Sequence, residues 1–141
     1  MSFSKLLLLA AVLFGTWHLW KVHQHPLFQR SVLADADPYG FIAVRMPDGS
    51  TSDAVIILAP LNCPSQGAHR ADALAKRLTE MGIANVRSSN YSISQLTADQ
   101  MPLVNRTAVV LEAEIPAVLV RGMGKANPTA DEVAFEYHRA N

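Results

Sequence analysis

The sequence has little cysteine and no excess of charge, and each shortage excludes a class of protein. Its single cysteine, Cys63, rules out an internal disulfide, a Cys-x-x-Cys redox pair and a thiolate zinc cluster. Its 12 basic and 12 acidic residues cancel, so a nucleic-acid partner attracted by net charge is also excluded. What the sequence does have is a hydrophobic content of 50% in 141 residues, which suffices for one folded domain and is inconsistent with a disordered chain.

The long apolar run lies at the N-terminus, where residues 6–20 follow a basic start. These 15 residues are shorter than a bilayer requires, but Phe3 and Val22 extend the run to a workable span. A small-x-small cleavage site does not follow the run directly, and residues 34–36, which fit that pattern, lie too far downstream. We therefore predict an uncleaved single-pass membrane anchor over residues 1–22. A cleaved signal peptide and a buried N-terminal helix are the alternatives.

Residues 23–40 are predicted to link the anchor to the folded domain, because prolines and polar residues are scattered there without a sustained period. His23 and His25 have the spacing of a metal-binding pair, but they lack an acidic or thiolate companion, so no metal site is predicted. Basic residues lie on both sides of the anchor, which leaves its orientation open. We take an extracytoplasmic domain as the working interpretation.

Residues 41–141 are predicted to form one α/β domain. A short β-prone run covers residues 41–45, and the continuous apolar run at residues 53–59 predicts a central strand that is buried on both faces. Apolar residues at helical spacing over residues 71–81 then predict a helix, which Gly82 ends. A second strand is expected at residues 83–87. This strand, helix, strand order predicts a parallel crossover connection.

The second half of the domain is predicted to hold two helices and a strand. Thr97-x-x-Gln100 is typical of a capping box that opens a helix through Leu111, although residues 107–111 would serve equally well as a strand; we favour the helix. Residues 117–121 predict a strand of the same sheet, followed by a tight turn at residues 122–124. A second capping box, Thr129-x-x-Glu132, predicts a terminal helix. We expect helices on both faces of the sheet.

Cys63 is the residue on which any chemistry of the domain depends. It lies in the turn between the predicted central strand and the helix that follows, where free backbone N–H groups and the helix dipole favour an anion. Such a position lowers the pKa of a thiol and raises its thiolate fraction. Pro64 fits the first turn of a helix, since it sacrifices no hydrogen bond there. The same residues are equally consistent with Cys63 as a small loop residue without chemistry.

The order of these features resembles the thioredoxin fold in its glutaredoxin-like form. The resemblance covers residues 54–137 and is carried by Cys63-Pro64-Ser65-Gln66 at the start of a helix and by Ile115-Pro116 before a strand. It implies a three-layer sandwich with a central mixed sheet, preceded here by an apolar N-terminal helix. It also implies that Cys63 is the nucleophile and that Pro116, in a cis peptide bond, faces it across the site.

The resemblance further implies a cofactor and a mechanism. In this family a small thiol, glutathione, is held beside the nucleophile. By the resemblance, Pro64 and Ile115 would contact it. Lys125 or Arg121 would supply a compensating positive charge in place of the family's own glutathione-binding segment. Gln66 stands where a second cysteine would resolve the intermediate, so the resemblance implies a monothiol mechanism that an external thiol completes.

Two functions from different classes stay open. The first is a membrane-tethered monothiol thiol-disulfide oxidoreductase, in which the Cys63 thiolate attacks the disulfide of a protein or of a small molecule. The second is a non-catalytic thioredoxin-fold module that serves as an anchored interaction or accessory subunit. Three departures from the family pattern favour the second function: Gln66 replaces the resolving cysteine, Pro60 replaces a lysine before the nucleophile, and residues 122–127 replace a segment that helps to hold glutathione.

Overall fold

The computed structural model describes residues 31–51 and 53–139 of the chain. The chain divides into two compact units, residues 1–35 and residues 36–141. The predicted anchor and residues 23–30 of the predicted linker, including His23 and His25, lie outside the described residues. In the first unit, residues 31–34 are helical. Within the part that is described, no helix combines the length and the apolar character needed to cross a membrane.

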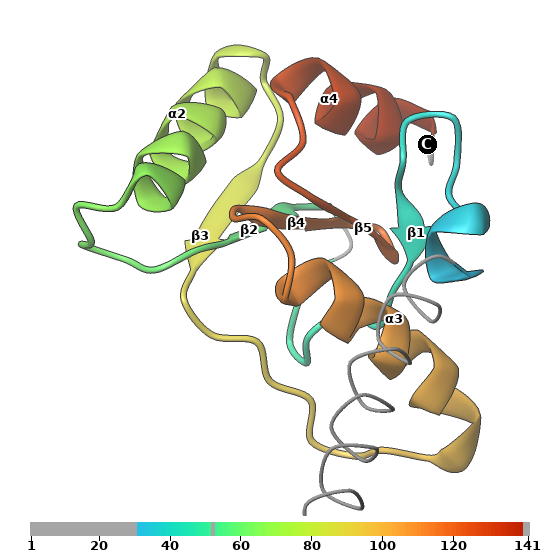
Figure 1. Ribbon diagram of the computed structural model, residues 1–141. Helices are drawn as coiled ribbons and strands as arrows, with labels where there is room; N and C mark the ends of the chain where they lie inside the picture. Colours follow the sequence, from blue (N-terminus) through green and yellow to red (C-terminus); the bar gives the residue numbers. More distant parts are fainter. Residues whose placement is uncertain (1–30, 52, 140–141) are drawn as a thin grey trace, which may run out of the picture. The chain divides into compact units, whose positions relative to one another are not determined.

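The second unit is built on a five-stranded mixed sheet (Figure 1). Along the chain, the strands are β1 (Ile42–Ala43), β2 (Val55–Leu58), β3 (Asn85–Ser88), β4 (Ala117–Val120) and β5 (Met123–Ala126). Their spatial order is β1-β5-β4-β2-β3. β2 is parallel to β3 and antiparallel to β4, and β5 is antiparallel to both β4 and β1. The expected parallel pairing of the first crossover is confirmed.

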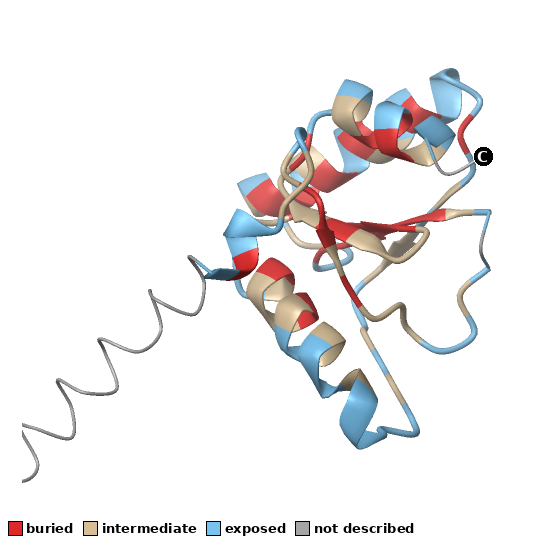
Figure 2. Cartoon of the chain, turned by 90° about the vertical axis from the view of Figure 1, so that its right-hand side faces the viewer, coloured by how far each residue is buried: buried red, intermediate tan, exposed pale blue. Residues whose placement is uncertain are grey.

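Helices cover both faces of this sheet, as expected (Figure 1). The helices α2 (Gln66–Glu80) and α4 (Ala130–Arg139) lie on one face, and α3 (Met101–Leu111) lies on the other. Figure 2 shows the buried residues gathered in the sheet and on the sides of the helices that face it. The unit therefore has a mixed α/β architecture, which is compatible with a thioredoxin-like fold.

β2 occupies the interior of the sheet because its side chains are apolar on both faces. All four of its residues are buried, which matches the prediction of a central strand over residues 53–59. The register places Ile57 opposite Val118 of β4 and opposite Arg87 of β3. On the face of α2 and α4, Ile57 and Val118 belong to a core cluster that includes Leu74, Leu78 and Val133.

The ends of the helices follow local signals in most cases. α2 ends before Gly82, whose φ of 75° is the left-handed conformation expected of a glycine that stops a helix. At α4, Thr129 and Glu132 form the predicted capping box, with reciprocal hydrogen bonds of 2.8 and 3.3 Å between backbone N–H groups and side-chain oxygens. Residues 107–111 are helical, as favoured, but the side chain of Thr97 does not cap the helix. A 3₁₀ turn, η1 (Ala98–Gln100), leads into α3 instead.

The hairpin between β4 and β5 corrects one prediction. β4 ends at Val120, and the two-residue turn consists of Arg121 and Gly122, with φ values of 49° and 83°. Positive φ at both positions is the geometry that joins two twisted antiparallel strands most tightly. Residues 123 and 124, which we expected in the turn, therefore begin β5. Pairing with β4 on one side and with β1 on the other holds this strand in place, although its own sequence has weak strand preference.

Candidate functional site

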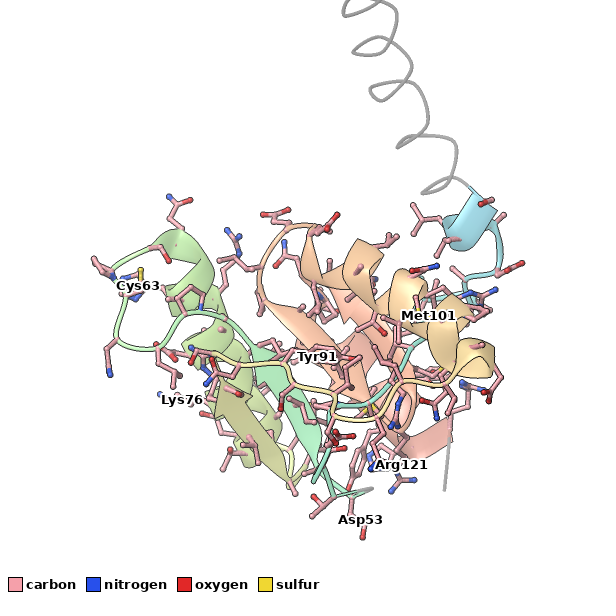
Figure 3. All side chains as sticks on the ribbon, turned by 90° about the horizontal axis from the view of Figure 1, so that it is seen from below. Asp53, Cys63, Lys76, Tyr91, Met101 and Arg121 are labelled. Atoms are coloured by element: carbon pink, nitrogen blue, oxygen red, sulfur yellow. The ribbon has the colours of Figure 1, made fainter. Side chains whose placement is uncertain are left out.

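Cys63 lies in the loop between β2 and α2, and its side chain is partly exposed. Figure 3 shows the sulfur in this loop, at the end of the sheet opposite to Asp53 and Arg121. The separation follows from the topology, because β2 begins just after Asp53 and ends before the loop of Cys63. Arg121 is therefore excluded as a source of positive charge beside the thiol.

Ser65 connects Cys63 to the start of α2. It is the N-cap of the helix, and its Oγ accepts a hydrogen bond from the Ala68 N–H at 3.3 Å. As hydrogen-bond donors, the Ser65 hydroxyl and to a lesser extent the Ser65 backbone N–H lower the pKa of the Cys63 thiol below its ordinary value, against a smaller opposing effect of desolvation. The direction of this shift agrees with the sequence expectation. The backbone N–H of Ser65 is a donor of the expected kind, whereas the larger contribution, from the Ser65 hydroxyl, was not expected.

The segment that leads into β4 lies against the first two turns of α2. The side chain of Ile115 covers Gly67, where a Cβ atom would overlap Cγ1 and Cδ1 of Ile115. One turn further along, Arg70 donates from Nε and Nη2 to the Ile115 carbonyl oxygen, at 3.2 and 2.8 Å. Its Nη2 also lies 2.9 Å from Glu114 Oε1. Ile115 is thus held at the same end of α2 as the loop of Cys63.

The two prolines of the expected site have different surroundings. The Ile115–Pro116 peptide bond is cis, as the resemblance implies. Pro116 is fully buried, so the protein itself covers the ring, and its carbonyl accepts a hydrogen bond from the Asn127 N–H at 2.7 Å. Pro64 is exposed. We had expected Pro64 in the first turn of α2. It precedes the N-cap residue Ser65 and therefore lies just outside that turn.

Lys125 is engaged in two polar contacts within the fold. Its ammonium group forms an ion pair with Glu132 Oε1 at 2.7 Å and donates to the carbonyl oxygen of Tyr39, also at 2.7 Å. The ion pair joins β5 to the first turn of α4, and the second contact joins β5 to the segment before β1. Because Glu132 neutralises its charge, Lys125 serves the fold, and the expectation that it binds glutathione finds no support in its contacts.

A cavity of about 400 Å³ adjoins this end of the sheet. Leu58 and Pro60 line it from the end of β2, Ile115 from the segment before β4, and Tyr91 from the loop after β3. The hydroxyl of Tyr91 is occupied, because it donates to the carbonyl oxygen of Arg45 at 2.8 Å. The volume is typical of a small-molecule site. Cys63 is not a lining residue, so the cavity is next to the loop of the thiol rather than around the sulfur.

Sequence reasoning missed Ser65 and Arg70. A serine directly before a helical apolar pattern is a common N-cap, and that signal identifies Ser65. Arg70 had no comparable signal, since its partners lie 44 and 45 residues away along the chain. Among residues 31–51 and 53–139, no three histidine, cysteine or acidic side chains gather where they could hold a metal ion. A comparison of the chain with models of protein families, with curated proteins and with solved structures found no match.

Proposed function

We propose that residues 41–141 form a thioredoxin-like domain of the glutaredoxin type, and that it catalyses monothiol thiol-disulfide exchange through Cys63. The observation that carries the proposal is the position of a partly exposed sulfur two residues before Ser65, the N-cap of α2, whose donor groups lower the pKa of the thiol and so favour the thiolate. The thiolate is the nucleophilic form of cysteine, and attack on a disulfide requires an accessible sulfur.

The order of the elements supports the same proposal. The strands β3, β2, β4 and β5 lie side by side in this order, with α2 after β2, α3 before β4 and α4 after β5. A glutaredoxin-like domain has this arrangement, with its nucleophile in the loop before the first of these helices. β1 extends the sheet beyond β5 as an additional edge strand.

The chemistry needs one protein thiol and one external thiol. The Cys63 thiolate attacks a disulfide, a new sulfur–sulfur bond forms, and the bond of the substrate breaks to release one half as a thiolate. An external thiolate, such as that of glutathione, then attacks the mixed disulfide and releases Cys63. Gln66, at the position of a resolving cysteine, cannot take part in this exchange, so the second step is intermolecular.

The proposal includes a membrane tether at residues 1–22. The support for it is the apolar run at residues 6–20, which lacks a cleavage site directly after it. The protein would then act on disulfides near a membrane surface. Extraction of isolated membranes with alkaline carbonate tests the tether: an anchored protein stays in the pellet with Met1–Trp20 intact, and a soluble form that begins near residue 36 contradicts it.

The exchange reaction is tested on the full chain in detergent. We expect the alkylation rate of Cys63 to rise with pH with a midpoint below the reference value of about 8.5 for a free cysteine. We also expect the protein to accelerate exchange between glutathione and bis(2-hydroxyethyl) disulfide. Cys63→Ser is the matched control, and because Cys63 is the only cysteine of the chain, this variant has no thiol background.

Two results together would contradict the proposal: an alkylation midpoint at or above that of a free cysteine, and exchange no faster than with Cys63→Ser. The second candidate function, a non-catalytic anchored module, predicts this outcome. The observation that favours it is the ion pair between Lys125 and Glu132, because Lys125 then supplies no net positive charge to a glutaredoxin-like site.

A further inference from the structure

The backbone carbonyl of Ile115 is already occupied in this structure. Arg70 directs two donors at it, with Nε at 3.2 Å and Nη2 at 2.8 Å. A carbonyl oxygen has two lone pairs, and a forked guanidinium fits such an acceptor with both of its donors. A peptide N–H could therefore hydrogen-bond to this oxygen only after Arg70 had moved away.

Two further contacts hold Arg70 and Ile115 in this arrangement. Glu114 pairs with Nη2 of Arg70 at 2.9 Å, which fixes the guanidinium beside the carbonyl. The side chain of Ile115 rests on Gly67 without space between them, which fixes the backbone that carries the carbonyl. The Arg70 side chain is 39% exposed, so the guanidinium that caps the carbonyl lies at the surface of the protein.

This arrangement bears on the kind of disulfide that Cys63 can attack. An extended polypeptide is recognised mainly by hydrogen bonds between backbones, as when a strand is added to a sheet. A small disulfide without peptide groups, such as bis(2-hydroxyethyl) disulfide, has no such backbone and loses nothing when the carbonyl is hydrogen-bonded to Arg70. The capped carbonyl of Ile115 therefore disfavours polypeptide disulfides selectively.

We propose that Arg70 is a specificity-determining residue, which by capping the Ile115 carbonyl makes Cys63 react less readily with polypeptide disulfides than with small disulfides that lack peptide groups. The inference rests on the proposed thiol-disulfide exchange at Cys63. The reaction itself is unchanged: the Cys63–substrate bond forms, the disulfide of the substrate breaks, and the electron pair leaves with the departing thiolate. Arg70 acts on access to the sulfur and takes no part in bond making.

The test compares two disulfides with the same leaving group. One is bis(2-hydroxyethyl) disulfide, and the other is the mixed disulfide between 2-mercaptoethanol and the one cysteine of an uncharged ten-residue peptide. Mass spectrometry of the full chain gives the rate at which each adduct forms on Cys63. The quantity of interest is the ratio of the peptide rate to the small-disulfide rate, because a change in the pKa of Cys63 affects both rates alike.

Two variants of Arg70 separate its geometry from its charge. Arg70→Met keeps the length of the stem without the donors, and Arg70→Lys keeps the charge without the fork. In both we expect the ratio to rise by about threefold to tenfold, the effect of one additional hydrogen bond. Arg77→Met is the matched control, because Arg77 lies on the same helix, is exposed and pairs only loosely with Glu80, at 3.4 Å. Its ratio should equal that of the wild type.

The outcomes distinguish this inference from the function on which it rests. If the wild type reacts with the small disulfide but the ratio is unchanged in both folded Arg70 variants, the specificity role is wrong and the exchange function stands. A wild type that already prefers the peptide overturns the role in the same way. If Cys63 reacts with neither disulfide, the proposed function and this inference fail together. Should Arg70→Met not fold, Arg70→Lys alone decides the question.

Discussion

The side chain of Ile115 lies directly on Gly67, so the first turn of α2 and the segment before β4 meet without space for a single methyl group. Gly67 is buried and lies in ordinary helical backbone, which any residue can adopt. Glycine is required here by the close approach of Ile115 and not by an unusual backbone angle. The contact links α2, the helix that follows Cys63, to the segment before β4, where Arg70 caps the Ile115 carbonyl.

Gly67→Ala should therefore destabilise the protein. In an exposed helix this change would stabilise by up to about 1 kcal/mol, because alanine has the higher helix propensity. At this position the added methyl group overlaps Ile115, and overpacking of this kind costs about 1–3 kcal/mol. We expect a net loss in the free energy of unfolding, measured by urea denaturation.

The same variant in an Ile115→Ala background provides the control for that loss. Once the larger side chain is removed, the methyl group at position 67 has space, and Gly67→Ala should cost little or should stabilise the protein. An increase in the free energy of unfolding for Gly67→Ala alone would show that the two segments do not pack as described.

Ser65→Gly separates the two roles of the N-cap residue. Glycine caps a helix almost as well as serine, so the free energy of unfolding should change by only a few tenths of a kcal/mol. The hydroxyl donor to the sulfur is lost, so the pKa of the Cys63 thiol should rise and its alkylation near neutral pH should slow several-fold. Ser65→Thr, which keeps a hydroxyl, should retain both properties. A pH profile of alkylation that is the same in Ser65→Gly and the wild type would contradict the role of this donor.

Thr107 links α3 to the chain after β1 and is 1% exposed. Its Oγ1 accepts a hydrogen bond from the Arg45 N–H at 2.9 Å and donates to the carbonyl oxygen of Leu103 at 2.8 Å. Thr107→Val keeps the shape but leaves a partly buried N–H without its acceptor, which should cost about 1–3 kcal/mol in the free energy of unfolding. Thr107→Ser keeps the hydroxyl and should lose less. Equal losses in the two variants would mean that packing, and not the hydrogen bond, matters at this position.

Glu132 should contribute to stability only while it is ionised. Partial burial opposes its ionisation, but hydrogen bonds from Lys125 and Thr129 outweigh this effect and lower the pKa of Glu132 below its ordinary value of 4.5. A lowered folded pKa means that the contribution is complete above the unfolded pKa and is lost as the pH falls through the folded value.

Glu132→Gln should therefore lower the free energy of unfolding at pH 7 by about 1 kcal/mol, allowing for the partial exposure of the pair. The difference from the wild type should shrink as the pH falls below 4.5. Glu80→Gln is the control, since Glu80 is exposed and its nearest partner, Arg77, is 3.4 Å away. A difference that stays constant from pH 7 to pH 3 would contradict the ionic role of Glu132.

The sequence by itself determined the elements whose signals are local. The apolar run at residues 53–59 predicted a buried central strand because a strand flanked on both sides and covered on both faces needs apolar side chains throughout. The periodicity over residues 71–81 with Gly82 after it predicted the body and the end of α2, and Thr129 with Glu132 predicted the start of α4. In each case the deciding interactions join residues within a few positions of one another or follow from burial alone.

Tertiary structure decided what depends on distant partners. The strand β5 has a sequence of weak strand preference, and it is a strand because β4 and β1 pair with it. Lys125 is neutralised because the fold brings Glu132 and Tyr39 to it. Arg70 caps the carbonyl of Ile115, 45 residues further along the chain, only because the crossover places α2 beside the start of β4. Contacts across such separations produce no periodic pattern in the sequence, because the fold of the intervening chain determines which side chains meet.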